Sequence, residues 1–184
     1  MRALVAVAAL AVAGCGAQAP RVVGVRVATG PLSSERATAV AVGAGRVLTV
    51  AHVLHGADPV FVGARRARVL RVDRRLDLAM LAVAGVRGEL RWGAAHAGER
   101  VTVRTLRGPS TARVRRVITA NVDGNVRPAL ELAANAQPGD SGAPVVADGR
   151  VLGVVFASGR NGIAYAVIGT RGSVGMSSQA ARSQ

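Results

Sequence analysis

Aromatic residues and cysteine are nearly absent from this chain of 184 residues, which restricts how it can build a core. Phe, Trp and Tyr together make up 2% of the sequence, and Cys15 is the only cysteine. The core must therefore consist of Val, Ala and Leu, and the many β-branched side chains favour sheet over helix. One cysteine cannot form an internal disulfide, so an exported domain with this sequence would be held by packing alone.

Lysine is missing altogether: all 24 basic residues are arginine, and with 10 acidic residues they give a net charge of +14. A positive surface is attracted to anionic membranes, cell-wall polymers or nucleic acid. The arginines are spread through strand-like segments, however, with no RNP-like or zinc-finger pattern and few aromatic residues for base stacking. We therefore expect a solvated basic surface and no nucleic-acid partner. The three histidines and the cysteine show no metal-ligand spacing, so we expect no metal or other cofactor.

A hydrophobic run long enough to span a bilayer is also lacking. The apolar run Ala3 to Ala13 follows a short positive start and is typical of a secretory signal. Its end, Val12-Ala13-Gly14-Cys15, resembles a bacterial lipobox, in which the cysteine is lipidated and becomes the first mature residue.

The alternative is an ordinary signal that is cut after residues 17–19, but Pro20 at the first mature position disfavours that cleavage. We predict a lipoprotein-type signal at residues 1–14 and a tether at 15–21. The protein would then lie at the outer face of the cytoplasmic membrane, anchored through lipid on Cys15, or be secreted.

Short apolar segments separated by Gly, Asp or Asn turns fill most of the remaining chain. Regular short strands without a long segment of 3.6-residue period predict an all-β sandwich or barrel. We expect one domain at 22–168, with halves at about 22–84 and 101–168 joined by a connector at 85–100, and a frayed or marginally helical polar tail at 169–184. The expected strands are Val22–Thr29, Thr38–Val42, Arg46–Val50, Pro59–Val62, Ala67–Val72, Leu78–Val83, Val101–Thr105, Ala112–Thr119, Pro128–Ala133, Ala143–Val146, Val151–Phe156 and Gly162–Val167.

Three segments carry residues suited to nucleophilic catalysis, in the order His, Asp, Ser. They are Leu48-Thr49-Val50-Ala51-His52, Asp77-Leu78-Ala79-Met80-Leu81 and Gly139-Asp140-Ser141-Gly142-Ala143-Pro144. A serine hydroxyl needs a base with a pKa near working pH, which His52 supplies, and Asp77 would fix the tautomer of His52 and offset its positive charge. Gly139 lets its own N–H and that of Ser141 converge on a developing oxyanion.

These three segments resemble those of chymotrypsin-like serine peptidases, especially the short bacterial branch of HtrA/Deg and actinobacterial membrane-linked acid-resistance proteases. The resemblance extends from about Val22 to Val167 and implies two perpendicular six-stranded antiparallel β-barrels with the active site between them. It implies that His52, Asp77 and Ser141 form the catalytic triad. No PDZ-like segment follows the motif that contains Ser141.

The sequence departs from the family in two places near the nucleophile. Ala143 replaces the second glycine of the usual G-D-S-G-G-P, which matters only if that backbone needs a positive φ. A lipidated Cys15 offers no free Ile or Val terminus for Asp140, which must find an arginine or backbone donors instead.

The resemblance also implies where the substrate side chain binds. It places the floor of the primary pocket at Asn135 and Ala136 and its walls at Val155, Phe156, Ala157 and Ser158. A floor without a carboxylate predicts cleavage after small or medium apolar residues in protein or peptide substrates.

Alternatives remain for single residues and for the function. Asp73 is the other candidate acid, but Asp77 directly precedes the apolar strand; His55 and His96 have no obvious partners and are expected on the surface. The function expected first is a serine endopeptidase. The alternatives are a catalytically weak binding module for anionic envelope components and an esterase or acyltransferase with the same triad. The sequence leaves the oligomeric state open.

Overall fold

The computed structural model of the protein describes residues 19–30, 33–55, 59–122 and 124–169. The predicted signal, Cys15, most of the tether and all but the first residue of the predicted tail lie outside these ranges. No helix in the described ranges is long and apolar enough to cross a membrane.

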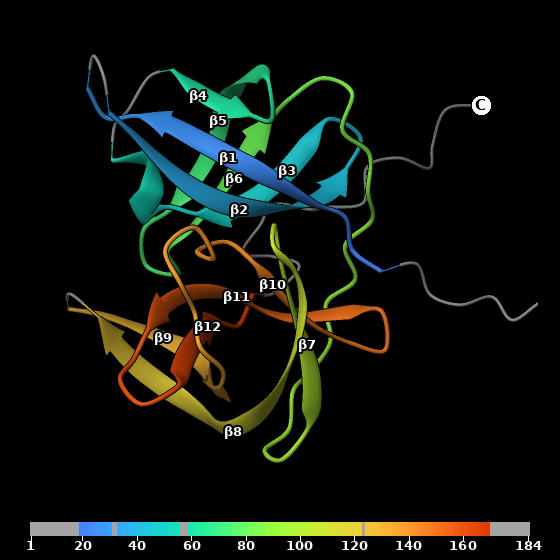
Figure 1. Cartoon of the computed structure of the whole chain (residues 1–184), viewed down its shortest axis with the longest axis vertical. Helices are drawn as coiled ribbons and strands as arrows, with labels where there is room; N and C mark the ends of the chain where they lie inside the picture. The colour runs from blue at the N-terminus through green and yellow to red at the C-terminus, as the bar shows by residue number, and fades with distance from the viewer. Residues whose placement is uncertain (1–18, 31–32, 56–58, 123, 170–184) are drawn as a thin grey trace, which may run out of the picture.

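Two closed antiparallel barrels of six strands each make up the molecule, one above the other in Figure 1. This confirms the expected all-β architecture, and all twelve expected strands are present, with shifted ends in all but Arg46–Val50. Strand order is β1-β2-β3-β6-β5-β4 in the first barrel and β10-β11-β12-β9-β8-β7 in the second. The strands are β1 Val22–Ala28, β2 Ser34–Gly43, β3 Arg46–Val50, β4 Val60–Val62, β5 Arg65–Asp73, β6 Leu78–Ala82, β7 Arg100–Thr105, β8 Gly108–Val122, β9 Asn125–Ala133, β10 Pro144–Ala147, β11 Arg150–Ser158 and β12 Ile163–Val167; a short 3₁₀ helix, η1, covers His52–Leu54.

The β8–β9 hairpin is the largest difference from the expected strands. Its pairing continues to Val122↔Asn125, beyond the ends that apolar alternation predicts. Val117 and Val126 in this hairpin are about half exposed. The backbone hydrogen bonds of this hairpin therefore continue beyond the segment whose side chains are buried. Alternation of apolar residues in the sequence cannot predict that extension.

Small aliphatic side chains fill both barrels, as the shortage of aromatic residues requires. In the first barrel Val40, Leu48 and Leu81 are fully buried, and this core continues into Val154 and Phe156 of β11. A core that crosses from one barrel to the other fixes their relative position, because packed interiors do not slide freely.

The segment between β6 and β7 is also attached to the second barrel. Trp92 forms a parallel bridge with Val151, and Gly93 donates a hydrogen bond of 3.0 Å to the same residue's carbonyl. The connecting chain is thus part of the seam between the barrels and holds β11 in place.

Candidate active site

His52 follows the end of β3 with one residue between them, at the start of η1, and contacts Asp77, which directly precedes the neighbouring strand β6. The backbone N–H of His52 donates to Asp77 Oδ1 at 2.8 Å, and its ring Nδ1 is 2.7 Å from Asp77 Oδ2. The N–H of Ala51 also donates to the Asp77 carbonyl at 3.0 Å. With the neutral imidazole protonated at Nδ1 toward this carboxylate, Nε2 is left as a proton acceptor.

The turn between β5 and β6 explains which aspartate meets the histidine. Asp73 accepts the backbone N–H of Leu76 at 2.9 Å and so closes the turn. Asp77 follows in a left-handed conformation, φ +57°, which aspartate tolerates better than most residues. The two candidate acids therefore have different tasks: Asp73 shapes the turn, and the turn presents Asp77 to His52.

The pKa of His52 is raised above its ordinary value of 6.5. The hydrogen bond to Asp77 is the main cause, and the negative charges of Asp77 and Glu35 act in the same direction. Burial and the positive charge of Arg127 partly offset this rise. Because the raising effects win, the imidazole is a stronger base than a free histidine.

The segment around Ser141 lies against the first barrel. The Thr38 N–H donates to the Ser141 carbonyl at 2.8 Å, and the Gly142 N–H donates to the Val155 carbonyl at 2.7 Å. Thr38 in turn accepts the hydroxyl of Thr49, three residues before His52, at 2.8 Å. The half-buried Ser141 is thus tied to the β2–β3 pair at whose end His52 lies.

Gly142 has to be glycine for this contact to form. Its φ is +90°, and a Cβ on it would lie 1.8 Å from the Thr38 carbonyl oxygen. Ala143 is different: its backbone has no positive φ and its methyl group is fully buried in the second core. The change from the usual glycine at 143 therefore causes no backbone strain here.

A tight turn before the serine sets the direction of two backbone N–H groups. Asp140 donates its N–H to the Gln137 carbonyl at 2.9 Å, with Pro138 and Gly139, φ +93°, between them. Proline followed by a glycine of positive φ is the pattern of a type II turn. Within the described part of the chain, neither the Gly139 N–H nor the Ser141 N–H donates a hydrogen bond, so both remain free for a ligand.

Asp140 is 4% exposed and holds this turn from inside. Its Oδ2 accepts the Gln137 N–H at 2.9 Å, and its Oδ1 pairs with the Arg107 guanidinium. Both kinds of partner expected for this aspartate, an arginine and a backbone donor, are therefore present.

The residues expected around the substrate side chain differ in how exposed they are. Asn135 and Ser158 are exposed, and Ala136 and Ala157 are half-buried, while Phe156 is buried at the seam. The side chain of Val155 is 2% exposed and packs in the second core. Alternate side chains of a strand point to opposite faces, so Val155 contributes only its backbone here, through the bond from Gly142.

A hollow of about 630 Å³ opens beside the His52–Asp77 pair. The apolar part of its lining includes Leu54, Val72 and Phe156, and Arg127 also faces it. Sequence analysis missed this arginine, because the expected strand began one residue later. The sequence feature that could have identified Arg127 is its place at an inward position of β9, where an apolar residue is expected.

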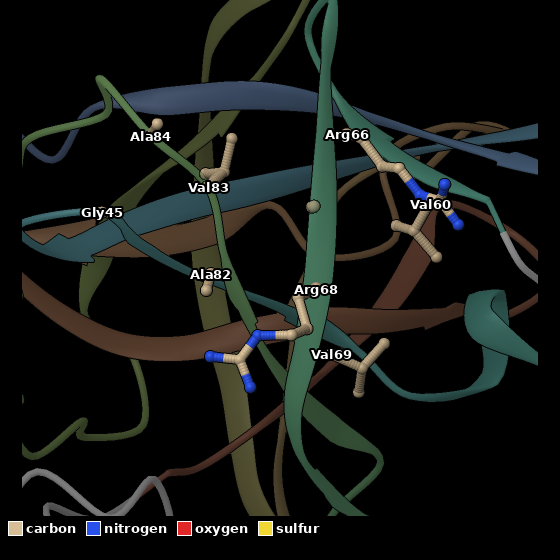
Figure 2. Close-up of a pocket in the computed structure, with 9 residues that line it drawn as sticks. Gly45, Val60, Arg66, Arg68, Val69, Ala82, Val83 and Ala84 are labelled. Atoms are coloured by element: carbon tan, nitrogen blue, oxygen red, sulfur yellow. The ribbon is translucent and has the colours of Figure 1, made fainter.

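A second hollow, of about 800 Å³, lies in the wall of the first barrel (Figure 2). Its lining is apolar apart from Arg66 and Arg68, whose side chains extend in opposite directions from β5. It holds no acid, base or nucleophile, so the site beside His52 is the one equipped for chemistry.

Of the two remaining histidines, His55 lines the hollow beside His52. His55 and His96 are exposed, and the His96 N–H donates to Glu99 at 3.0 Å. In the ranges that the structure describes, no group of three or more His, Cys, Asp or Glu could hold a metal ion.

Comparison with known proteins agrees with this arrangement. A model of the trypsin-like peptidase domain family matches residues 37–154, more than half of the chain. The active form of the Rv3671c protease from M. tuberculosis is 28% identical, with a TM-score of 0.72, over 81% of this chain and 76% of that chain. The inactive form of the same protease is also 28% identical, with a TM-score of 0.68, over 80% of this chain and 82% of that chain.

A serine endoprotease from Yersinia pestis shares the fold at 22% identity, with a TM-score of 0.67, over 83% of this chain and 60% of that chain. No curated protein sequence matches. The family match and the shared double-barrel fold lead to one conclusion: the chain belongs to the trypsin-like peptidase domain family, and it is a serine endopeptidase.

Proposed function

We propose that this endopeptidase uses Ser141 as nucleophile, His52 as general base and acid, and Asp77 as the residue that orients His52. The pair of hydrogen bonds between His52 and Asp77 carries the proposal, because it leaves Nε2 as the acceptor. The attachment of the serine segment to β2, beside the strand that delivers His52, supports it.

The reaction then proceeds in two halves. Ser141 Oγ attacks the scissile carbonyl carbon while His52 Nε2 takes the hydroxyl proton, and the carbonyl oxygen becomes an oxyanion. The N–H groups of Gly139 and Ser141 stabilise that charge, and one such donor is typically worth about 10²–10³ in rate. The intermediate collapses when His52 gives the proton to the leaving amine, which leaves an acyl-enzyme.

In the second half, water attacks the acyl carbon and His52 takes a proton from that water. A second oxyanion forms at the same two N–H groups. Its collapse releases the carboxylic acid product and returns the proton to Ser141 Oγ. Throughout, Asp77 stays ionised and stabilises the imidazolium.

For the substrate, we propose a small or medium apolar residue before the scissile bond, with Asn135 and Ala136 at the pocket floor. Neither side chain carries a charge, so a basic substrate side chain would find no partner there. A peptide library should show cleavage after apolar residues. Preferred cleavage after Arg or Lys would refute this, and Asn135→Asp should shift cleavage toward those residues.

For the location, we propose an exported protein with a signal at residues 1–14 and lipid on Cys15. The lipobox-like segment and Pro20 support this reading. Expression of the full chain should give a membrane-bound lipidated protein, whereas Cys15→Ala should lack the lipid by mass spectrometry. An unmodified Cys15 in the wild type would contradict the anchor.

A fluorophosphonate probe, which reacts with activated serines, tests the triad directly. Wild type should be labelled and Ser141→Ala should not, with both proteins folded by circular dichroism. No labelling of folded wild type would favour the binding module for anionic components. Parallel ester and peptide substrates separate peptidase from esterase, because only the former cleaves amides efficiently.

A further inference from the structure

Arg127 is a buried arginine from the second barrel that reaches the acid of the first. It lies in β9 and is 4% exposed. Its Nη1 is 3.5 Å from Asp77 Oδ2, the oxygen that also contacts the His52 ring, and its guanidinium carbon lies 5.2 Å from the centre of the Phe156 ring. The guanidinium is thus held between an aromatic face and a carboxylate at the seam.

Burying an arginine here costs more free energy than burying an apolar side chain of similar volume would. Among the described residues, Nε of Arg127 is buried and has no hydrogen-bond partner, and such a donor costs about 1–3 kcal/mol. Burying a charge is costly as well, and apolar side chains of similar volume often replace buried ion pairs without loss of stability. Packing alone therefore does not account for an arginine at this place.

The contacts of Asp77 show what the arginine does. Oδ1 accepts the His52 backbone N–H, while Oδ2 is shared between the His52 ring and Arg127. Asp77 is 8% exposed, so water can do little to stabilise its charge. A fixed cation beside Oδ2 attracts the carboxylate and limits its rotation.

We propose that Arg127 is a positioning residue of the active site, which holds the Asp77 carboxylate aimed at His52 from across the seam. This inference rests on the function proposed above for His52 and Asp77. It also means that the two barrels must be docked for the acid to be correctly placed, since the arginine and the aspartate belong to different barrels.

The positive charge also acts on the histidine. It lowers the pKa of His52, against the larger raising effect of Asp77 and the smaller one of Glu35. Removing the charge should therefore move the protonation of His52 to higher pH, whereas loss of a purely structural contact should not. The other ionisable side chains that line the same hollow are those of His55 and Arg74.

The test compares Arg127→Met, which removes the charge but keeps an extended apolar side chain, with Arg127→Lys, which keeps the charge. Arg116→Met is the control, because Arg116 also pairs with a buried carboxylate, Glu131, but is not among the charges that shift the pKa of His52. Full-length protein with ¹⁵N-labelled histidine is titrated by NMR, with the His52 signals assigned from His52→Gln. Peptide hydrolysis is measured in parallel.

We expect the His52 midpoint to rise in Arg127→Met and to stay near wild type in Arg127→Lys and Arg116→Met. In Arg127→Met, kcat should fall by about 10- to 100-fold with little change in KM, as for misplaced catalytic groups. A wild-type kcat together with an unchanged His52 midpoint in folded Arg127→Met would overturn the proposal.

If Arg127→Met does not fold, Arg127→Lys decides the matter, because lysine keeps the charge but has no planar guanidinium to lie between the Phe156 ring and Asp77 Oδ2. A lower kcat at unchanged KM supports the proposal, and a wild-type kcat overturns it. The NMR titration reports the coupling of Arg127 to His52 whether or not the protein is active. It therefore separates failure of this inference from failure of the proposed triad, which the Ser141→Ala labelling test detects.

Discussion

The hydroxyl of Thr38 in the first barrel donates a hydrogen bond of 2.8 Å to the carbonyl of Gly139, 101 residues later in the sequence. This bond fixes the peptide group between Gly139 and Asp140, which lies between the free N–H groups of Gly139 and Ser141. Thr38 is completely buried, so water cannot replace its hydroxyl. The packing of the two barrels thus helps to set the direction of the proposed oxyanion donors.

Thr38→Val should impair catalysis more than folding. Valine keeps the shape but leaves the Gly139 carbonyl without its donor, which should cost about 1 kcal/mol of unfolding free energy. A turn that is less well fixed should lower kcat by roughly tenfold, less than loss of a donor itself. Thr49→Val is the control, since it removes a similar buried bond inside the first barrel. Equal kcat values for the two variants would contradict this role of Thr38.

Gly142→Ala should unfold the protein or destabilise it by at least about 3 kcal/mol, because the new Cβ would overlap the Thr38 carbonyl oxygen. Gly63→Ala is the matched control: its φ is +59°, but no atom lies within 4 Å of the added carbon. The control should cost only about 1–2 kcal/mol for the left-handed backbone. Urea denaturation measures both, and similar losses would show that strain, not the overlap, matters.

Arg107→Met should loosen the turn at Gln137 to Asp140. The buried Asp140 carboxylate would keep only its bond from the Gln137 N–H. Breaking a buried pair is costly, but Arg107 is half exposed, so we expect a loss of about 1–2 kcal/mol. The rate of fluorophosphonate labelling should fall as well. Arg91→Met, which alters an exposed pair with Glu89, should change neither quantity.

The activity should fall on the acid side with a midpoint above pH 6.5, because the Asp77 hydrogen bond raises the pKa of His52 and only the neutral imidazole accepts a proton. The pH profile of kcat/KM measures this midpoint. A midpoint at or below pH 6.5 would contradict the raised pKa.

Stability should depend on pH through the same group. A folded pKa above the unfolded value means that protonated His52 stabilises the fold; this contribution is complete below pH 6.5 and is lost as the pH rises through the folded pKa. The Tm difference between wild type and His52→Gln should therefore be larger at pH 5.5 than at pH 9. His96→Gln, at an exposed position, should show no such trend.

Much of the fold could be predicted from short apolar segments alone. Alternating Val, Ala and Leu between turn residues gave twelve strands in two sets, because burial of one face imposes a period of two. The ends of β8 and β9 could not be predicted this way, since their outer parts pair through the backbone while Val117 and Val126 stay exposed. The burial of the Val155 side chain could not be predicted for a related reason: the resemblance named a segment, but only the strand's orientation decides which side chains face the core.

The sequence by itself determined which residues suited to catalysis are present and where the local turns around them lie. It contained the Asp-Ser-Gly segment, the aspartate before an apolar strand and the histidine after one, because turn and strand chemistry is local. Only the tertiary structure decided how Asp77 meets His52, that Arg107 pairs with Asp140, and that Arg127 reaches Asp77. Those contacts join segments far apart in the sequence, and their existence depends on barrel closure and docking, which no local pattern encodes.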